Sequence, residues 1–222
     1  MKTRERILET ARSLFNESGT AAISTNHIAD ALGISPGNLY YHFRNKEEII
    51  RAIFEQQFAQ WDRLYNLPDD RAPALADLER LVRATFELSW DYRFIYRELI
   101  ALLRRDPLLQ GRWVAVRERG FSGFRELVDQ FVAGGVLRAP ADPAETTRLA
   151  ELCWLISEFW LASVEVSGAL VDAAQMERGI ALMLQTLAPF IVDQRLEPTS
   201  AASQPAPPIV PARSAKSPGS KK

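Results

Sequence analysis

The residues most able to take part in recognition chemistry lie between positions 24 and 46, where amide, hydroxyl and ring side chains stand on two short predicted helices. Ile28, Ala29 and Leu32 are spaced as one apolar helix face, and Gly33 follows them directly. Two short helices joined by a tight turn form a helix-turn-helix, whose second helix enters the DNA major groove. The pattern therefore predicts contact with base edges.

Local signals position these two helices. Either Ser24 or Thr25 can cap the first helix, because a side-chain oxygen accepts hydrogen bonds from the unpaired N–H groups of the first turn. Gly33 ends this helix, since glycine adopts the left-handed conformation at little steric cost. Ser35 caps the second helix, and Pro36 fits its first turn, where a missing N–H costs nothing.

The same segment resembles the DNA-binding domain of the TetR family of bacterial transcriptional regulators. The resemblance covers about residues 4–54. It includes a preceding helix with Ile7, Leu8, Ala11, Leu14 and Phe15 before Gly19, and then the run Leu39-Tyr40-Tyr41-His42-Phe43 followed by Lys46. The resemblance implies a DNA-binding regulator with a second, helical domain.

The resemblance also implies which side chains face DNA. Its base-facing positions are Asn26, Pro36, Gly37, Asn38, Tyr41 and His42, and its phosphate-facing positions are Thr25, Tyr40 and Lys46, with Ser35 at the same surface. Amides can pair with an adenine edge, and small apolar residues suit a thymine methyl group. Two alternatives stay open: Tyr40 can instead be a core residue, and His42 an ordinary surface histidine.

Composition and charge are those of an ordinary globular protein. The chain has 222 residues, 47% hydrophobic and 25% charged, with a net charge of −1. Residues 1–46 hold six basic and four acidic side chains, which is a mild positive bias. The single cysteine, Cys153, fits a reducing cytoplasm. The most apolar stretch, residues 149–164, is too short and too charged to span a bilayer, so we expect a cytoplasmic protein without membrane contact.

The sequence offers no catalytic or metal-binding constellation. There is no Gly-rich phosphate loop, paired metal motif or nucleophile elbow, and the acidic residues are scattered at helix-surface spacing. Cys153 has no histidine near it in the sequence, and His27 and His42 have no nearby cysteine pattern. We therefore predict that the protein is not an enzyme and has no metal or cofactor.

We predict an all-α fold. Residues 1–46 form an N-terminal three-helix helix-turn-helix DNA-binding domain, residues 47–196 a C-terminal helical ligand-binding and dimerisation domain, and residues 197–222 a Pro-rich disordered tail. Helices are expected at about residues 3–18, 25–32, 36–43, 46–65, 73–90, 91–105, 107–132, 144–167 and 172–195. Gly111 and Gly120 are candidate kinks in the 107–132 helix.

The last two predicted helices carry broad apolar faces, which family members use to form a four-helix bundle with a partner. The resemblance therefore implies a homodimer through these helices, and the alternative is that both helices fill the monomer core. In the family the central helices of this domain enclose a ligand cavity, so the resemblance implies one in the aromatic middle of this chain, mostly apolar with a few polar groups. The candidate ligand contacts are Trp90, Phe94, Arg97, Trp113, Arg117, Phe121, Trp154 and Glu158. The alternative is that these rings are core residues and the charges surface ion pairs.

The function expected from these features is that of a ligand-responsive transcriptional regulator. It would bind a palindromic double-stranded DNA operator as a homodimer, act as a repressor, and be released by a small, largely apolar effector. The alternative is a DNA-binding scaffold regulated by a protein partner or without any ligand.

Overall fold

The computed structural model describes residues 2–67 and 71–192, so the predicted tail at 197–222 lies outside the described residues. Within these ranges the chain is all-α, as predicted. The helices are α1 (Thr3–Ala22), α2 (Thr25–Leu32), α3 (Pro36–His42), α4 (Lys46–Leu64), α5 (Leu75–Asp91), α6 (Arg93–Arg105), α7 (Pro107–Ala133), α8 (Pro143–Val166), α9 (Ala173–Leu187) and the short 3-10 helix η1 (Ala188–Phe190). None of the described helices combines the length and hydropathy that crossing a bilayer requires.

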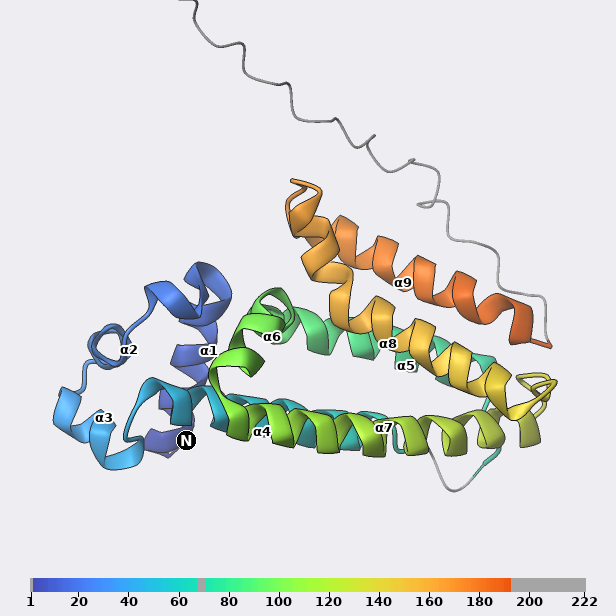
Figure 1. Ribbon diagram of the computed structural model, residues 1–222, viewed down its shortest axis with the longest axis horizontal. Helices are drawn as coiled ribbons and strands as arrows, with labels where there is room; N and C mark the ends of the chain where they lie inside the picture. Colours follow the sequence, from blue (N-terminus) through green and yellow to red (C-terminus); the bar gives the residue numbers. More distant parts are fainter. Residues whose placement is uncertain (1, 68–70, 193–222) are drawn as a thin grey trace, which may run out of the picture.

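Helices α1–α3, here called the head, gather at one end of the molecule (Figure 1). Helix α4 runs from the head into the rest of the fold, here called the body, which consists of α5–α9. Helices α8 and α9 pack side by side along one edge of the body. The long α4 is therefore the direct covalent connection between the two parts.

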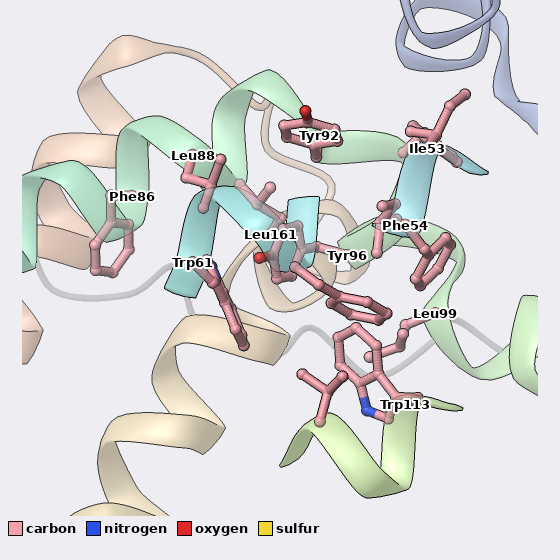
Figure 2. Packing of buried hydrophobic residues seen from close by; sticks show 14 of the residues in the cluster. Ile53, Phe54, Trp61, Phe86, Leu88, Tyr92, Tyr96, Leu99, Trp113 and Leu161 are labelled. Carbon is pink, nitrogen blue, oxygen red and sulfur yellow. The ribbon is translucent and has the colours of Figure 1, made fainter. Parts of the chain in front are cut away.

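Side chains from α1 and α6 join the head to the body. Phe15 on α1 and Phe94 on α6 are fully buried, and their ring centroids lie 5.3 Å apart. The body core continues along α4, where Phe54 and Trp61 meet Trp113 of α7 (Figure 2). Head and body thus share one continuous apolar core, which couples their relative positions.

One local prediction about glycines is confirmed and another needs correction. The regular first helix ends before Gly19, as predicted: Gly19 has φ 78° and ψ 159°, outside the helical region, and one further helical turn, to Ala22, follows this kink. The expected kink at Gly111 or Gly120 was wrong, because α7 runs unbroken from Pro107 to Ala133. Gly120 has a packing reason instead, since a Cβ atom there would lie 2.7 Å from the Trp154 ring.

Candidate nucleic-acid interface and internal cavity

The turn between α2 and α3 has the geometry that its sequence predicts. Ser24 caps α2, with its hydroxyl oxygen accepting from His27 N at 3.2 Å, while His27 Nδ1 accepts from Ser24 N at 3.3 Å. Gly33 ends α2 in the left-handed region at φ 65°. Ser35 caps α3 by accepting from Asn38 N at 3.2 Å. His27 therefore has a structural role as the partner in a capping box.

One face of α3 is anchored in the head, and the opposite face is exposed. Leu39 is fully buried, and Phe43, which follows the helix, is 3% exposed. On the outer face Tyr41 is 85% exposed, and Pro36, Gly37 and Asn38 at the start of the helix are exposed as well. The half-buried His42 packs edge-on against Tyr41 at 5.2 Å. Helix α3 therefore presents polar and aromatic side chains to solvent, while its buried residues hold it in place in the head.

The residues predicted to contact phosphates are partly engaged within the head. The hydroxyl groups of Thr25 and Tyr40 are hydrogen-bonded to each other at 3.0 Å, which ties α2 to α3. Tyr40 is 47% exposed, so it is not a core residue, and Asn26 beside Thr25 is exposed. The hydroxyl pair and the Asn26 amide lie on the same two helices as the exposed face of α3, and DNA contact by them stays a prediction.

Lys46 has a role that sequence reasoning missed. Its ammonium group donates to the carbonyl oxygens of Thr20 at 2.6 Å and Ile23 at 2.9 Å. Because an ammonium group has three donors, one remains for a phosphate. Lys46 therefore fastens the start of α4 to the turn between α1 and α2.

A second set of contacts fastens the C-terminal part of α1 to the start of α6 and to Glu98 within it. The Glu98 carboxylate accepts from Thr20 N at 2.9 Å and from Thr20 Oγ1 at 2.5 Å. Asn16 on α1 donates from Nδ2 to the Asp91 carbonyl at 2.9 Å and accepts from Phe94 N at 3.0 Å, so it caps the start of α6. These partners are more than 70 residues apart, and no local sequence signal predicts them. The only sequence hint was Gly19, which marks a bend in the chain.

An internal cavity of about 70 Å³ lies between α4 and the helices of the body. Its lining is mostly apolar, with hydroxyl, thiol and indole N–H groups as the polar exceptions. The lining residues are Trp61, Tyr65, Leu78, Leu81, Val82, Thr85, Phe124, Leu127, Val128, Phe131, Leu137, Cys153, Trp154, Ser157, Met183 and Leu187. An adjoining hollow of about 190 Å³ between α4 and α7 shares Trp61, Tyr65, Phe124 and Trp154 with it. Trp61 and Tyr65 are not among the ligand contacts that the sequence predicts.

The predicted ligand contacts fall into two groups, and one of them surrounds Trp154. Trp154 lines the cavity, and Phe121 stacks on its ring with centroids 4.5 Å apart. The Arg117 guanidinium lies over Phe121 and donates to the Glu158 carboxylate at 3.1 Å. Burial raises the pKa of Glu158, and the Arg117 charge opposes this shift only in part. The structure thus brings Trp154, Phe121, Arg117 and Glu158 together.

The other group lies away from the cavity. Trp113 packs against Phe54 and Phe58. Phe94 belongs to the contact with the head. The Arg93 guanidinium lies over the Trp90 ring, and Arg97 forms a salt bridge with Glu165 of α8. Ligand contact by any of the eight candidates stays a prediction.

The outer face of α8 carries an apolar stripe, defined here as Leu152, Leu155, Phe159, Ala162 and Val166. Leu152 is 50% exposed, Leu155 53% and Val166 90%, with Phe159 and Ala162 half-buried between them. The spacing of three and four residues places all five on one side of the helix. On the neighbouring α9, Leu182 is 40% exposed. An apolar stripe of this length is typical of a surface that another protein covers.

Comparison with known proteins identifies the family. Residues 7–53 match the family model described as bacterial regulatory proteins of the tetR family, and residues 55–198 match the model described as bacterial transcriptional repressor. The chain is 37% identical over 86 residues to the HTH-type transcriptional repressor KstR2 of Mycobacterium tuberculosis, a match that spans 38% of this chain and 42% of that relative.

Solved structures extend the similarity to the whole described fold. A TetR-family transcriptional regulator from Marinobacter aquaeolei superposes with a TM-score of 0.77 at 32% identity, covering 87% of this chain and 93% of that one. SmeT in complex with triclosan gives a TM-score of 0.62 at 25% identity, covering 93% of this chain and 99% of that one. The two family models together cover both parts of the fold, and the chain belongs to the TetR family of DNA-binding transcriptional regulators.

Proposed function

We propose that this protein is a ligand-responsive repressor, which binds a two-fold DNA operator as a homodimer and releases it when a small, largely apolar effector binds. The observation that carries the proposal is the double role of α4. Its first residue, Lys46, holds the turn between α1 and α2, and Trp61 near its other end lines the internal cavity. A shift of α4 that accommodates an effector would therefore move the head.

The proposed DNA contacts divide by chemistry. Asn26 and Asn38 carry exposed amides suited to an adenine edge, and Pro36 and Gly37 offer a small surface to a thymine methyl group. Tyr41 is the most exposed ring of α3 and would reach furthest into the groove. Phosphate contacts by Thr25, Tyr40 and Lys46 would fix the register of the head on the duplex without reading sequence.

The proposed dimer forms through the apolar stripe of α8 together with α9. Burying these side chains against their counterparts in a second copy would remove apolar surface from water and produce a four-helix bundle. One head recognises only a few base pairs, so a two-fold pair of heads lengthens the recognised site. The two α3 helices would then sit about 34–36 Å apart, or a related distance, to meet successive major grooves on one face of the DNA.

The proposed switch follows from the small size of the cavity. At about 70 Å³ it is well below the ~300–1,000 Å³ of typical ligand pockets. An effector would therefore have to enlarge it by separating α4 from α7 and α8, and so would favour a conformation in which the heads are displaced. A coupling of ~1–3 kcal/mol, typical of such switches, changes operator affinity by about 5- to 150-fold.

The same small cavity favours a second candidate function, a DNA-binding scaffold with a filled core that responds to a protein partner or to no ligand.

Repression itself is supported by the similarity to KstR2, a transcriptional repressor. The single buried thiol, Cys153, is compatible with action in the cytoplasm.

Native mass spectrometry of the purified protein, repeated under denaturing conditions, tests both the dimer and the ligand. A dimer carrying a releasable small molecule supports the sensor, whereas a dimer that neither carries nor takes up any small molecule supports the scaffold. Selection from random double-stranded DNA then defines the operator, and fluorescence anisotropy measures its affinity. We expect an inverted repeat to be enriched. A monomer at micromolar concentration, or the absence of any enriched sequence, would contradict the proposal.

A further inference from the structure

Two buried hydrogen-bond donors beside the cavity have no acceptor among the described residues. They are the indole N–H groups of Trp61 on α4 and Trp154 on α8. Both residues are more than nine-tenths buried, with 8% and 7% of their surface exposed. Both line the cavity as well as the adjoining hollow. A third tryptophan, Trp160, provides the contrast, since its N–H donates to the Gln175 carbonyl at 2.8 Å.

Unpaired donors of this kind are rare in folded proteins, because burying an N–H without an acceptor loses the hydrogen bond that water would provide. When such groups occur they call for an explanation, for instance a partner that is not part of the chain. Here two of them belong to side chains that meet at one cavity. A ligand that brings a hydrogen-bond acceptor would satisfy them.

The charges around the cavity indicate that this ligand is neutral. None of the cavity-lining residues carries a charge at neutral pH. Asp62 and Arg119 line only the outer hollow, and Arg117 is already paired with Glu158. An ionic group would lose its water without gaining a counterion, which is strongly unfavourable in an apolar site.

The aromatic rings that line the cavity and the hollow indicate that the ligand is flat. The Phe121 and Trp154 rings are stacked with an angle of 16° between their planes. Gly120 and Gly123 of α7 line the hollow with bare backbone, and the Trp154 ring lies where a Cβ of residue 120 would stand. Phe121 therefore covers one face of the Trp154 ring. Four ring side chains line both the cavity and the hollow, namely Trp61, Tyr65, Phe124 and Trp154, and such a lining suits an aromatic or fused-ring molecule.

We propose that the cavity binds a neutral, flat, largely apolar molecule bearing a hydrogen-bond acceptor, which accepts from the indole N–H groups of Trp61 and Trp154. This inference rests on the proposed ligand-responsive function and adds the chemical class of the effector. It excludes carboxylates and other anions as the preferred effectors.

Three matched probes test the proposal by isothermal titration calorimetry on the full chain. They are 2-acetylnaphthalene, its isosteric hydrocarbon 2-isopropenylnaphthalene, and the anion 2-naphthoate. The measured quantity is the ratio of ketone to hydrocarbon affinity, because the ratio cancels the apolar burial that both probes share. Trp61→Phe and Trp154→Phe each remove one donor and keep a ring, so each should lower the ratio by roughly 2- to 13-fold, the effect of one ordinary hydrogen bond. Trp160→Phe removes an indole whose N–H is already paired and should leave the ratio unchanged.

A second measurement uses the unaltered protein. Among its five tryptophans, two indole N–H resonances should shift when the ketone binds and should respond less to the hydrocarbon. An unchanged affinity ratio in both Phe variants would overturn the proposal, and so would tighter binding of 2-naphthoate than of the ketone. Failure of all three probes to bind would also refute this ligand class. Release of the operator by a cell extract would in that case preserve the proposed regulatory function.

Discussion

Replacing Gly19 by alanine should loosen the head from the body. Gly19 has φ 78° and ψ 159°, a region of backbone conformation that is essentially restricted to glycine. A Cβ atom at this position would lie 2.8 Å from the Glu98 carboxylate oxygen that accepts from Thr20 N. The substitution therefore strains the backbone and displaces the carboxylate that fastens the end of α1 to α6.

The expected loss of stability combines two terms. Backbone strain in this region costs of order 1–3 kcal/mol for a residue with a side chain. Hydrogen bonds to a charged group contribute ~1.5–3 kcal/mol each, and we take the lower end for one lost bond because Glu98 is half-buried. Gly19→Ala should therefore lower the free energy of unfolding by about 2–5 kcal/mol.

Urea unfolding followed by circular dichroism measures this change, and operator affinity by anisotropy should fall with it. Gly123→Ala is the matched control, because Gly123 lies inside α7 and a Cβ there meets nothing within 4 Å. That control should stabilise the protein by about 0.5–1 kcal/mol. In a Glu98→Ala background, Gly19→Ala should cost only the backbone strain, since the clash and the hydrogen bonds are already gone.

Two results would refute this reasoning. If Gly19→Ala were as stable as the unaltered protein, the positive φ would not constrain the residue at this position. If its cost were the same with and without Glu98, the contact between α1 and α6 would not contribute to the effect.

Tyr41→Ala should leave unfolding unchanged, because the side chain is 85% exposed, while weakening operator binding by ~1–3 kcal/mol in an anisotropy titration; equal binding would remove Tyr41 from the interface. Leu155→Glu places a charge in the apolar stripe of α8 and should yield monomers in analytical ultracentrifugation, whereas a persistent dimer would place the interface elsewhere. The Arg71 guanidinium holds the pKa of Asp77 well below its usual value, so this pair stabilises the fold above about pH 3.8 and the contribution is lost as the pH falls further. Asp77→Asn should therefore reduce the loss of stability as the pH falls below about 3.8. An unchanged dependence of stability on acid pH would contradict the pairing. Burial raises the pKa of Cys153 to about 12, so iodoacetamide at neutral pH should label it only after unfolding; labelling of the folded protein at the unfolded rate would contradict its burial.

The helix-turn-helix could be predicted from sequence because its signals are local. Ser24 and Ser35 cap the two helices and Gly33 ends the first, and each of these contacts spans five residues or fewer. The exposed face of α3 follows from the same information, since Leu39 and Phe43 must both point into the head. Short-range hydrogen bonds and helical periodicity determine this part of the structure.

Glycines show where local reasoning was insufficient. Gly120 predicted a kink, but α7 continues through it as one unbroken helix. The missing side chain instead makes room for Trp154. Gly19 marked the end of a helix, but its conformation is explained by the turn that Glu98 holds. A glycine signals that a side chain is not tolerated, and only the neighbouring elements show why.

The sequence by itself determined the helical class, the reading head and the aromatic character of the body. Tertiary structure decided that Lys46 fastens the α1–α2 turn, and that Glu98 reaches Thr20 across 78 positions. It also decided that Trp61 and Trp154 line the cavity while Trp113 fills the core. The physical reason is that removing an apolar ring from water is favourable at any buried site. Its place in the core or beside the cavity therefore depends on how helices distant in sequence pack together.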